Sequence, residues 1–247
     1  MSFTNYDPIG QRVSFIDERF YTKDNVIFYP GVTTILGVVD KGSQYKRWLQ
    51  TNGMNADVIM REAMNEGSRI HEAIELFLKG NEINWATDEG VAIYTKSEWI
   101  KISKFMDFYD NFKPDIIAIE MIIVSDKLQY GSQLDLICKL NGQRFLIDHK
   151  SGGLYDFGMQ LAAMRELWNE NFPKEPIEKC AVLHLDATTR GRDKQEKISQ
   201  GIGWKLVEID EIDKQFEDFK HVQAIWKRQN PNFRPQNLIY PSSYKRN

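Results

Sequence analysis

The sequence predicts an α/β (α+β) fold, in which helices flank a central mixed β-sheet and an N-terminal helical elaboration precedes the sheet. Three observations predict it. Apolar residues recur at helical spacing over 55–79 and 95–112. Asn141-Gly142 separates two apolar-rich runs, which is the pattern of a two-residue β-hairpin. A helical segment over 156–171 then separates strand-like runs, so a crossover adds a parallel or mixed edge to the sheet.

Short elements are expected before the long helices. β-like runs occur over 12–16 and 25–29, and Pro30-Gly31 ends the second of them. A short helix that carries apolar and aromatic side chains is expected over 43–52.

Two long helices follow. The first, over 55–79, ends at Gly80, and Gly67 interrupts its periodicity. A mid-helix glycine costs about 1 kcal/mol against alanine, so Gly67 indicates either a close approach by another backbone or a break between two helices. The second helix, over 95–112, presents an aromatic face that is expected to join the core, and Pro114 ends it.

The sheet is predicted from the rest of the chain. Strands are expected on both sides of the Asn-Gly turn and over 116–124, 179–185 and 204–209, with a charge-rich loop over 188–203 and a final helix over 211–228. We expect one domain over 1–247, made of a helical elaboration over 43–113, a βββαβ core over 114–210, and a C-terminal helix and tail over 211–247.

Composition excludes several classes of protein. The 247 residues are 42% hydrophobic and 27% charged, which is ordinary for a globular domain. No apolar run approaches the roughly 18 residues of a membrane span, and the first residues lack a secretory leader, so a cytoplasmic protein with no membrane attachment is expected. Cys138 and Cys180 fall in predicted strands as buried thiols, and two cysteines are too few for an iron–sulfur cluster. The net charge of -3 gives no support to a nucleic-acid partner.

The hairpin brings two acidic side chains face to face. The two-residue turn pairs Leu140 with Gln143, which places Asp135 directly opposite Asp148. Paired side chains lie roughly 5 Å apart at Cβ on one face of the sheet, and like charges there are destabilising unless a cation lies between them. Lys150, two residues beyond Asp148, points to the same face. Two carboxylates and an ammonium on adjacent strands predict a divalent-metal hydrolase site.

These residues resemble the motif of a known family. The pattern Gly131-x-x-x-Asp135, followed by Asp148-x-Lys150, resembles the PD-(D/E)XK nuclease superfamily. Three further segments resemble its RecB-like exonuclease branch, which has phage and mitochondrial-genome-maintenance-type members: 67–72 is similar to a G-x-x-x-H helix motif, Gln160 to the start of a Q-x-x-x-Y motif, and 29–36 to a P-x-V-T-T-I-L opening. One position departs from the branch, because Met164 stands where the motif has Tyr.

The resemblance implies a restriction-endonuclease-like fold and a Mg²⁺- or Mn²⁺-dependent DNA exonuclease. Such an enzyme would act on DNA with a free or single-stranded end, in recombination, repair or phage genome processing, inside a bacterial or phage-infected cell. The implied metal ligands are His71, Asp135, Asp148 and the main-chain carbonyl of His149. The expected catalytic residues are Asp135, Asp148, Lys150 and Glu120, and the expected nucleic-acid contacts are Gln160, Arg69 and Arg165. A structure-specific or restriction-type endonuclease and a non-catalytic nucleic-acid-binding relative are the alternatives, and oligomeric state is left open.

Several of these residues also have an ordinary structural interpretation. The helical spacing of His71 fits a core histidine, Glu120 fits a salt-bridge partner, and Gln160 fits a helix-start side chain. The segment from His71 to Glu75 differs from the zinc motif H-E-x-x-H at its last position, so a zinc protease is not expected. The basic residues of the charged loop are expected to be solvated; they are Arg190, Arg192, Lys194 and Lys197.

Overall fold

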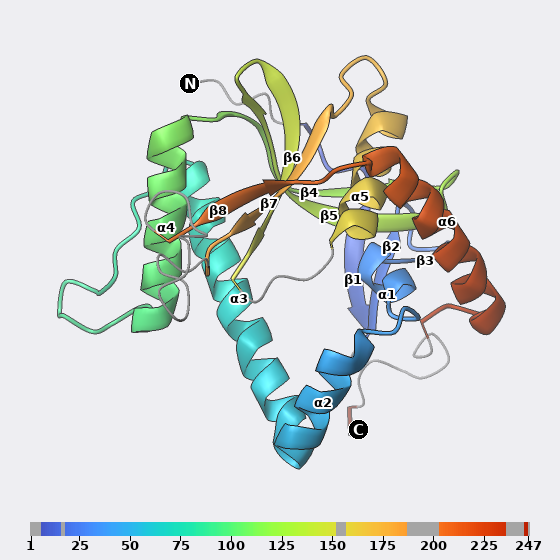
Figure 1. Cartoon of the computed structure of the whole chain (residues 1–247), viewed down its shortest axis with the longest axis horizontal. Coiled ribbons are helices and arrows are strands. Elements are labelled where there is room, and N and C mark those ends of the chain that lie inside the picture. Colours follow the sequence, from blue (N-terminus) through green and yellow to red (C-terminus); the bar gives the residue numbers. More distant parts are fainter. Residues whose placement is uncertain (1–5, 16–17, 152–156, 187–202, 236–244, 247) are drawn as a thin grey trace.

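A five-stranded mixed sheet forms the centre of the molecule. The computed structural model describes residues 6–15, 18–151, 157–186, 203–235 and 245–246. The strand order is β4-β5-β6-β7-β8 (Figure 1), with β4 at Asp115–Ser125, β5 at Tyr130–Leu140, β6 at Gln143–Lys150, β7 at Lys179–His184 and β8 at Lys205–Glu208. The predicted α/β architecture with a central mixed sheet is therefore confirmed.

Strands β4, β5 and β6 form an antiparallel meander, and the Asn-Gly turn sets its register. Leu140 pairs with Gln143 and Leu136 with Ile147, as the sequence predicts. Asn141 and Gly142 have φ values of 50° and 84°, the left-handed pair that a tight hairpin turn requires. After the crossover helix, β7 pairs parallel with β6, and β8 pairs antiparallel with β7.

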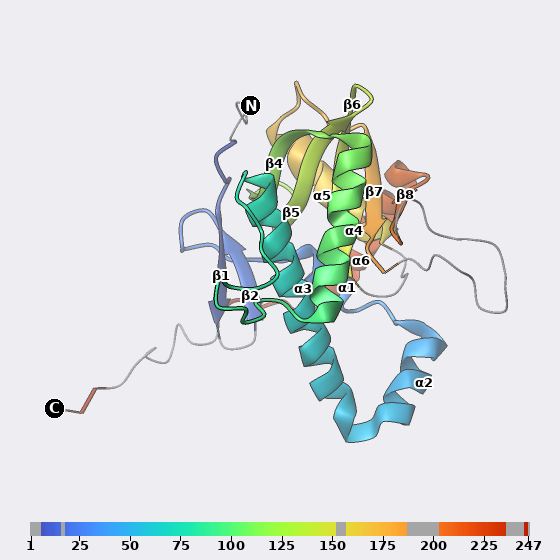
Figure 2. The same ribbon diagram turned by 90° about the vertical axis from the view of Figure 1, so that its left-hand side faces the viewer.

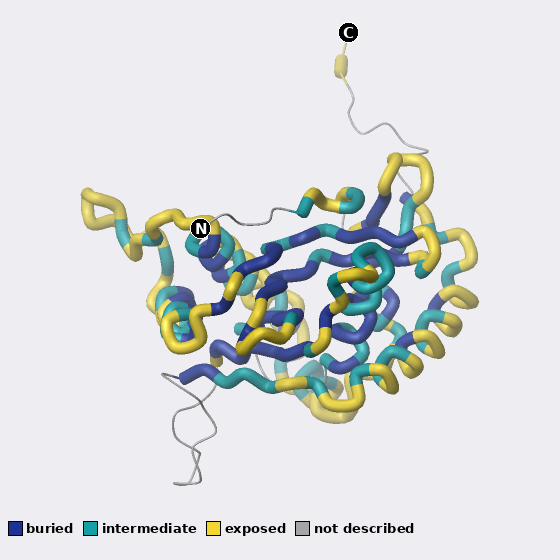
Figure 3. Tube along the Cα trace, turned by 90° about the horizontal axis from the view of Figure 1, so that it is seen from above, coloured by how far each residue is buried: buried dark blue, intermediate teal, exposed yellow. Residues whose placement is uncertain are grey.

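Helices cover both faces of this sheet (Figures 1 and 2). Helices α3 (Ala56–Leu78) and α4 (Lys96–Phe112) pack on one face, and α5 (Gly158–Asn171) and α6 (Ile212–Gln229) pack on the other. The core under α3 and α4 includes Ile70, Ile74, Phe105, Phe108, Leu136 and Ile147. The core under α5 and α6 includes Leu161, Leu167, Phe219, Ile137 and Leu146. Figure 3 shows the resulting layers, with buried strands between helices that expose their outer sides.

A small N-terminal sheet lies beside β4 and β5. It consists of β1 (Gln11–Phe15), β2 (Glu18–Thr22) and β3 (Tyr29–Pro30), and α1 (Val32–Leu36) follows it. The strand expected over 25–29 is therefore wrong except at its last residue, because Asp24 accepts hydrogen bonds from the next backbone N–H groups and forms a turn. Strand β2 was not expected from the sequence; Gly31 bridges Gly131, which anchors this sheet to β5.

An arm made of α2 and the first half of α3 projects from the body (Figures 1 and 2). Helix α2 spans Gly42–Asn52, and a 3₁₀ turn, Gly53–Asn55, joins it to α3. Helix α3 is continuous through Gly67, so the break, which was one of two alternatives, does not occur. The nearest group to a Cβ added at Gly67 is the Ser151 Oγ at 3.6 Å, so a side chain rather than a backbone approaches this position.

Three other expectations concern the cysteines, a membrane span and the charged loop. Cys138 and Cys180 are buried free thiols, as expected, and burial raises the pKa of each to about 12. No helix in the described part of the chain is long and apolar enough to cross a membrane. The charged loop expected over 188–203 lies outside the described residues except for Gly203, and so do Arg190, Arg192, Lys194 and Lys197.

We predict opposite stability effects for alanine at two glycines. A Cβ at Gly131 would lie 2.5 Å from the Tyr21 Cβ, so Gly131→Ala should lower the free energy of unfolding by about 1–3 kcal/mol. Gly67→Ala places a methyl group in ordinary contact inside a helix, and it should raise that free energy by up to about 1 kcal/mol. Urea unfolding of both variants tests this; equal stability of Gly131→Ala and the unaltered protein would contradict the close packing of β2 on β5.

Candidate active site

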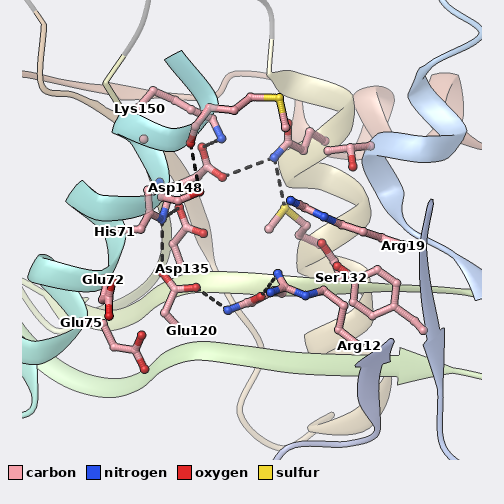
Figure 4. Close-up of a pocket in the computed structure, with 18 residues that line it drawn as sticks. Arg12, Arg19, His71, Glu72, Glu75, Glu120, Ser132, Asp135, Asp148 and Lys150 are labelled. Atoms are coloured by element: carbon pink, nitrogen blue, oxygen red, sulfur yellow. Dashed lines mark hydrogen bonds and ion pairs between the residues drawn. The ribbon is translucent and has the colours of Figure 1, made fainter. Parts of the chain in front are cut away.

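A pocket of about 440 Å³ lies where the central sheet meets α3, α5 and the N-terminal sheet. Asp135 and Asp148 reach it from β5 and β6, and Glu120 reaches it from β4. His71 approaches from α3 on one side, and Gln160 approaches from α5 on the other. Figure 4 shows the acidic side chains gathered around His71 and Lys150. Residues from five separate segments thus converge on one cavity.

The two hairpin aspartates are held by different partners. Asp148 is 1% exposed; its Oδ2 lies 2.7 Å from Lys150 Nζ, and its Oδ1 accepts from Gln160 Nε2 at 3.3 Å. Asp135 is 8% exposed, and its Oδ2 accepts from the His149 backbone N–H at 3.2 Å. The structure therefore brings Asp135, Asp148, Lys150 and Gln160 together, and Gln160 orients a carboxylate rather than simply beginning a helix.

Burial and mutual repulsion change the protonation of this group. Burial raises the pKa of Asp135, and the nearby charge of Asp148 raises it further, to about 8. Burial alone would lower the pKa of Lys150, but Asp148 and Asp135 raise it overall. Lys150 is consequently an ammonium at neutral pH, whereas Asp135 ionises fully only when further positive charge is near it.

Glu120 enters the pocket through an irregular stretch of β4. The register with β5 shifts between Ile116 and Ala118, and Glu120 has φ 48°, a left-handed conformation that is uncommon outside glycine. Such a conformation costs of order 1–3 kcal/mol and persists only where its surroundings impose it. Here the Glu120 carboxylate lies 3.2 Å from His71 Nδ1 and accepts from Gln133 Nε2 at 2.7 Å.

His71 faces the carboxyl groups of Glu120 and Asp135 rather than the core. Its Nδ1 lies 3.7 Å from Asp135 Oδ2, in addition to its contact with Glu120. Burial alone would lower the pKa of His71, but Asp135, Glu120 and Asp148 raise it to about 9. His71 is therefore an imidazolium at neutral pH in the metal-free protein.

The ring of His149 is a component that the sequence reasoning missed. It stacks on the His71 ring with centroids 3.8 Å apart, and burial holds its pKa well below the usual value. Ligand atoms of His71, Glu120 and His149 lie within 4.8 Å of one another, so these three side chains are candidate metal ligands. Strand alternation offered a signal, because His149 must point away from Asp148 and Lys150, toward the face that α3 covers.

Two of the expected nucleic-acid contacts lie elsewhere. Arg69 Nε donates to Glu98 at 2.7 Å, and Arg165 pairs with Glu166 and Asp213. Neither arginine lines the pocket.

Two arginines that the sequence reasoning did not single out do line the pocket. They are Arg12 on β1 and Arg19 on β2. No local motif marks them, because their position depends on how the N-terminal sheet packs against β5.

Comparison with known proteins adds little to this geometry. The sequence matches no family model and no curated protein. Among solved structures, a "putative exonuclease" from Eubacterium rectale is similar with a TM-score of 0.38 and 11% sequence identity, over 74% of this chain and 76% of that chain.

The charge coupling in the pocket can be measured in the metal-free protein. Asp135 is the largest of the influences that raise the pKa of His71, so Asp135→Asn should lower this pKa from about 9 toward its usual value. NMR titration of the His71 imidazole in EDTA provides the measurement. Asp115→Asn, at the exposed start of β4, is the matched control and should leave the titration unchanged. An unaltered His71 pKa in Asp135→Asn would contradict the arrangement.

Proposed function

We propose that this protein is a metal-dependent DNA exonuclease of the RecB-like PD-(D/E)XK type, which hydrolyses phosphodiester bonds in recombination, repair or phage genome processing. The observation that carries the proposal is the convergence of Asp135, Asp148 and Lys150 in one pocket, with Lys150 Nζ 2.7 Å from Asp148. His71, which the G-x-x-x-H motif singles out, lies in the same pocket, and Glu120 reaches that pocket from the neighbouring strand β4.

The donor atoms suit a hard divalent cation. Asp135, Asp148 and Glu120 offer carboxylate oxygens, which Mg²⁺ prefers, and His71 offers a nitrogen that Mn²⁺ accepts more readily. The His149 N–H points toward β5, where Asp135 accepts its hydrogen bond. The carbonyl of a strand residue points to the same side as its N–H, so the His149 carbonyl also faces the acidic group. When bound, such an ion polarises a phosphate and lowers the pKa of a coordinated water.

The side chains of the chain itself supply positioning and charge. Lys150 keeps its proton and is anchored by Asp148, so it can contact a non-bridging phosphate oxygen and offset the charge that develops during hydrolysis. Gln160 fixes the carboxylate of Asp148 from α5. Glu120 contacts His71 Nδ1, and Gln133 in turn donates to the Glu120 carboxylate. The site is therefore built on strands and helices whose packing restricts each functional group.

We predict that Asp148→Asn and Lys150→Ala each reduce Mg²⁺- or Mn²⁺-dependent cleavage of DNA by at least about 100-fold. The fold should remain intact by circular dichroism. Asp115→Asn and Lys139→Gln are the charge-matched controls at exposed positions outside the pocket, and both should cleave normally. Full activity in either site variant would refute the assignment.

Metal affinity should increase as pH rises. His71 and Asp135 hold protons below about 9 and about 8 respectively, and an incoming cation must displace these protons. Calorimetric titration with Mn²⁺ from pH 6.5 to 9 should show tighter binding and fewer released protons at the higher pH values. His71→Ala should flatten this dependence; an unchanged profile would remove His71 from the ligand set.

One assay separates this function from its alternatives. Single- and double-stranded DNA labelled at either end, with circular controls, is incubated with Mg²⁺ or with EDTA. Mononucleotide release from an end supports the exonuclease. Cutting of circles would favour a structure-specific or restriction-type endonuclease, and binding without cleavage would favour a non-catalytic nucleic-acid-binding protein.

A further inference from the structure

The wall of the pocket opposite the acidic group is basic. Arg12 and Arg19 come from the β1–β2 hairpin, and Figure 4 shows both reaching toward the side of the cavity that holds His71 and Asp135. No carboxylate neutralises either guanidinium within the described part of the chain. Arg12 donates to the neutral amide oxygen of Gln133 at 2.5 Å, and the guanidinium of Arg19 makes no hydrogen bond or ion pair with a described residue.

The hairpin register places these two cations on the same face. Arg12 pairs with Tyr21, and Ser14 pairs with Arg19. Arg12 and Arg19 are thus diagonal neighbours, a relation in which side chains start roughly 7–8 Å apart and long side chains meet. Two like charges at that spacing repel each other, and an anion between them reverses the sign of the interaction.

Tyr21 completes this wall. Its ring packs against Gly131, which fixes the hairpin against β5. The register pairs Tyr21 directly with Arg12, and all three side chains line the pocket. Burial raises the pKa of the Tyr21 hydroxyl, and the charges of Arg12 and Arg19 oppose that rise. Arg12, Arg19 and Tyr21 thus line one wall of the pocket, on strands whose position is restricted by packing.

We propose that Arg12 and Arg19 form a phosphate-binding subsite that holds a non-scissile phosphate of the substrate strand. This inference rests on the proposed nuclease function. A strand whose scissile phosphate lies at Asp135 and Asp148 would bring another of its phosphates to Arg12 and Arg19. Arginine suits this role because its planar fork donates two parallel hydrogen bonds to phosphate oxygens. The subsite sets where the strand lies relative to Asp135 and Asp148.

Binding is measured apart from cleavage. A fluorescent oligonucleotide is titrated in Ca²⁺ in place of Mg²⁺, with its integrity checked on a gel. Arg19→Gln should weaken binding by about tenfold or more. It should also reduce the slope of log K against log[salt] by about 0.7, the loss of one phosphate contact on a single strand. Arg19→Lys should restore most of the slope, since it keeps the charge, and Lys139→Gln, which removes a charge from the far end of β5, should bind normally.

The arms of the experiment identify the source of the phosphate. Oligonucleotides with a phosphate or a hydroxyl at each end are compared. If removal of one terminal phosphate abolishes the difference between Arg19→Gln and the unaltered protein, the subsite holds a terminal phosphomonoester. If Arg19→Gln binds more weakly than the unaltered protein whichever group ends the oligonucleotide, the subsite holds an internal phosphodiester.

Two results separate the subsite from the catalytic proposal. Unchanged affinity and unchanged salt slope in both Arg19→Gln and Arg12→Gln, in a protein that cleaves DNA, would overturn the subsite alone. A protein that never cleaves, but loses oligonucleotide affinity in both variants, would refute the nuclease and retain the phosphate subsite.

Discussion

The repulsion between two buried carboxylates is the constraint on which the rest of this structure depends. The Asn-Gly turn fixes the register that places Asp135 against Asp148, and burial removes the water that would screen them. A chain that keeps this pair must surround it with positive charge. Lys150 provides that charge from β6, and the imidazolium of His71 provides it from α3, which an apolar core holds against the same sheet.

The strain at Glu120 follows from the same constraint. A left-handed glutamate within a strand is unfavourable by itself. It is maintained because it directs a carboxylate at His71 Nδ1 and accepts from Gln133, which in turn accepts from Arg12. A line of hydrogen bonds thus runs from α3 through β4 and β5 to the N-terminal hairpin. These hydrogen bonds connect Arg12, on the basic wall of the pocket, to Glu120 and His71 beside the aspartates.

Features that depend on interactions between residues close in sequence could be predicted, whereas features that depend on distant segments could not. The hairpin register could be predicted because a two-residue turn determines it locally, and helix α3 could be predicted from its periodicity. The roles of Arg12 and Arg19 could not, since they depend on packing between segments more than a hundred residues apart. The expectation that Arg69 contacts nucleic acid overlooked helix geometry. Arg69 lies two positions before His71, and residues at that spacing occupy different faces of a helix. Its pairing with Glu98 agrees with that geometry.

The net charge of the whole chain does not describe the local charges that a ligand meets in the pocket. A total of -3 gives no support to a phosphate partner, but charges separated by more than about 8 Å are largely screened at physiological ionic strength. A strand in the pocket would therefore respond to the walls beside it rather than to the whole surface. One wall holds carboxylates that need a cation, and the other holds guanidiniums that need an anion. Under the proposed function, a metal ion and a phosphodiester strand satisfy both requirements together, so an acidic protein can recognise a polyanion by separating its charges across a single cavity.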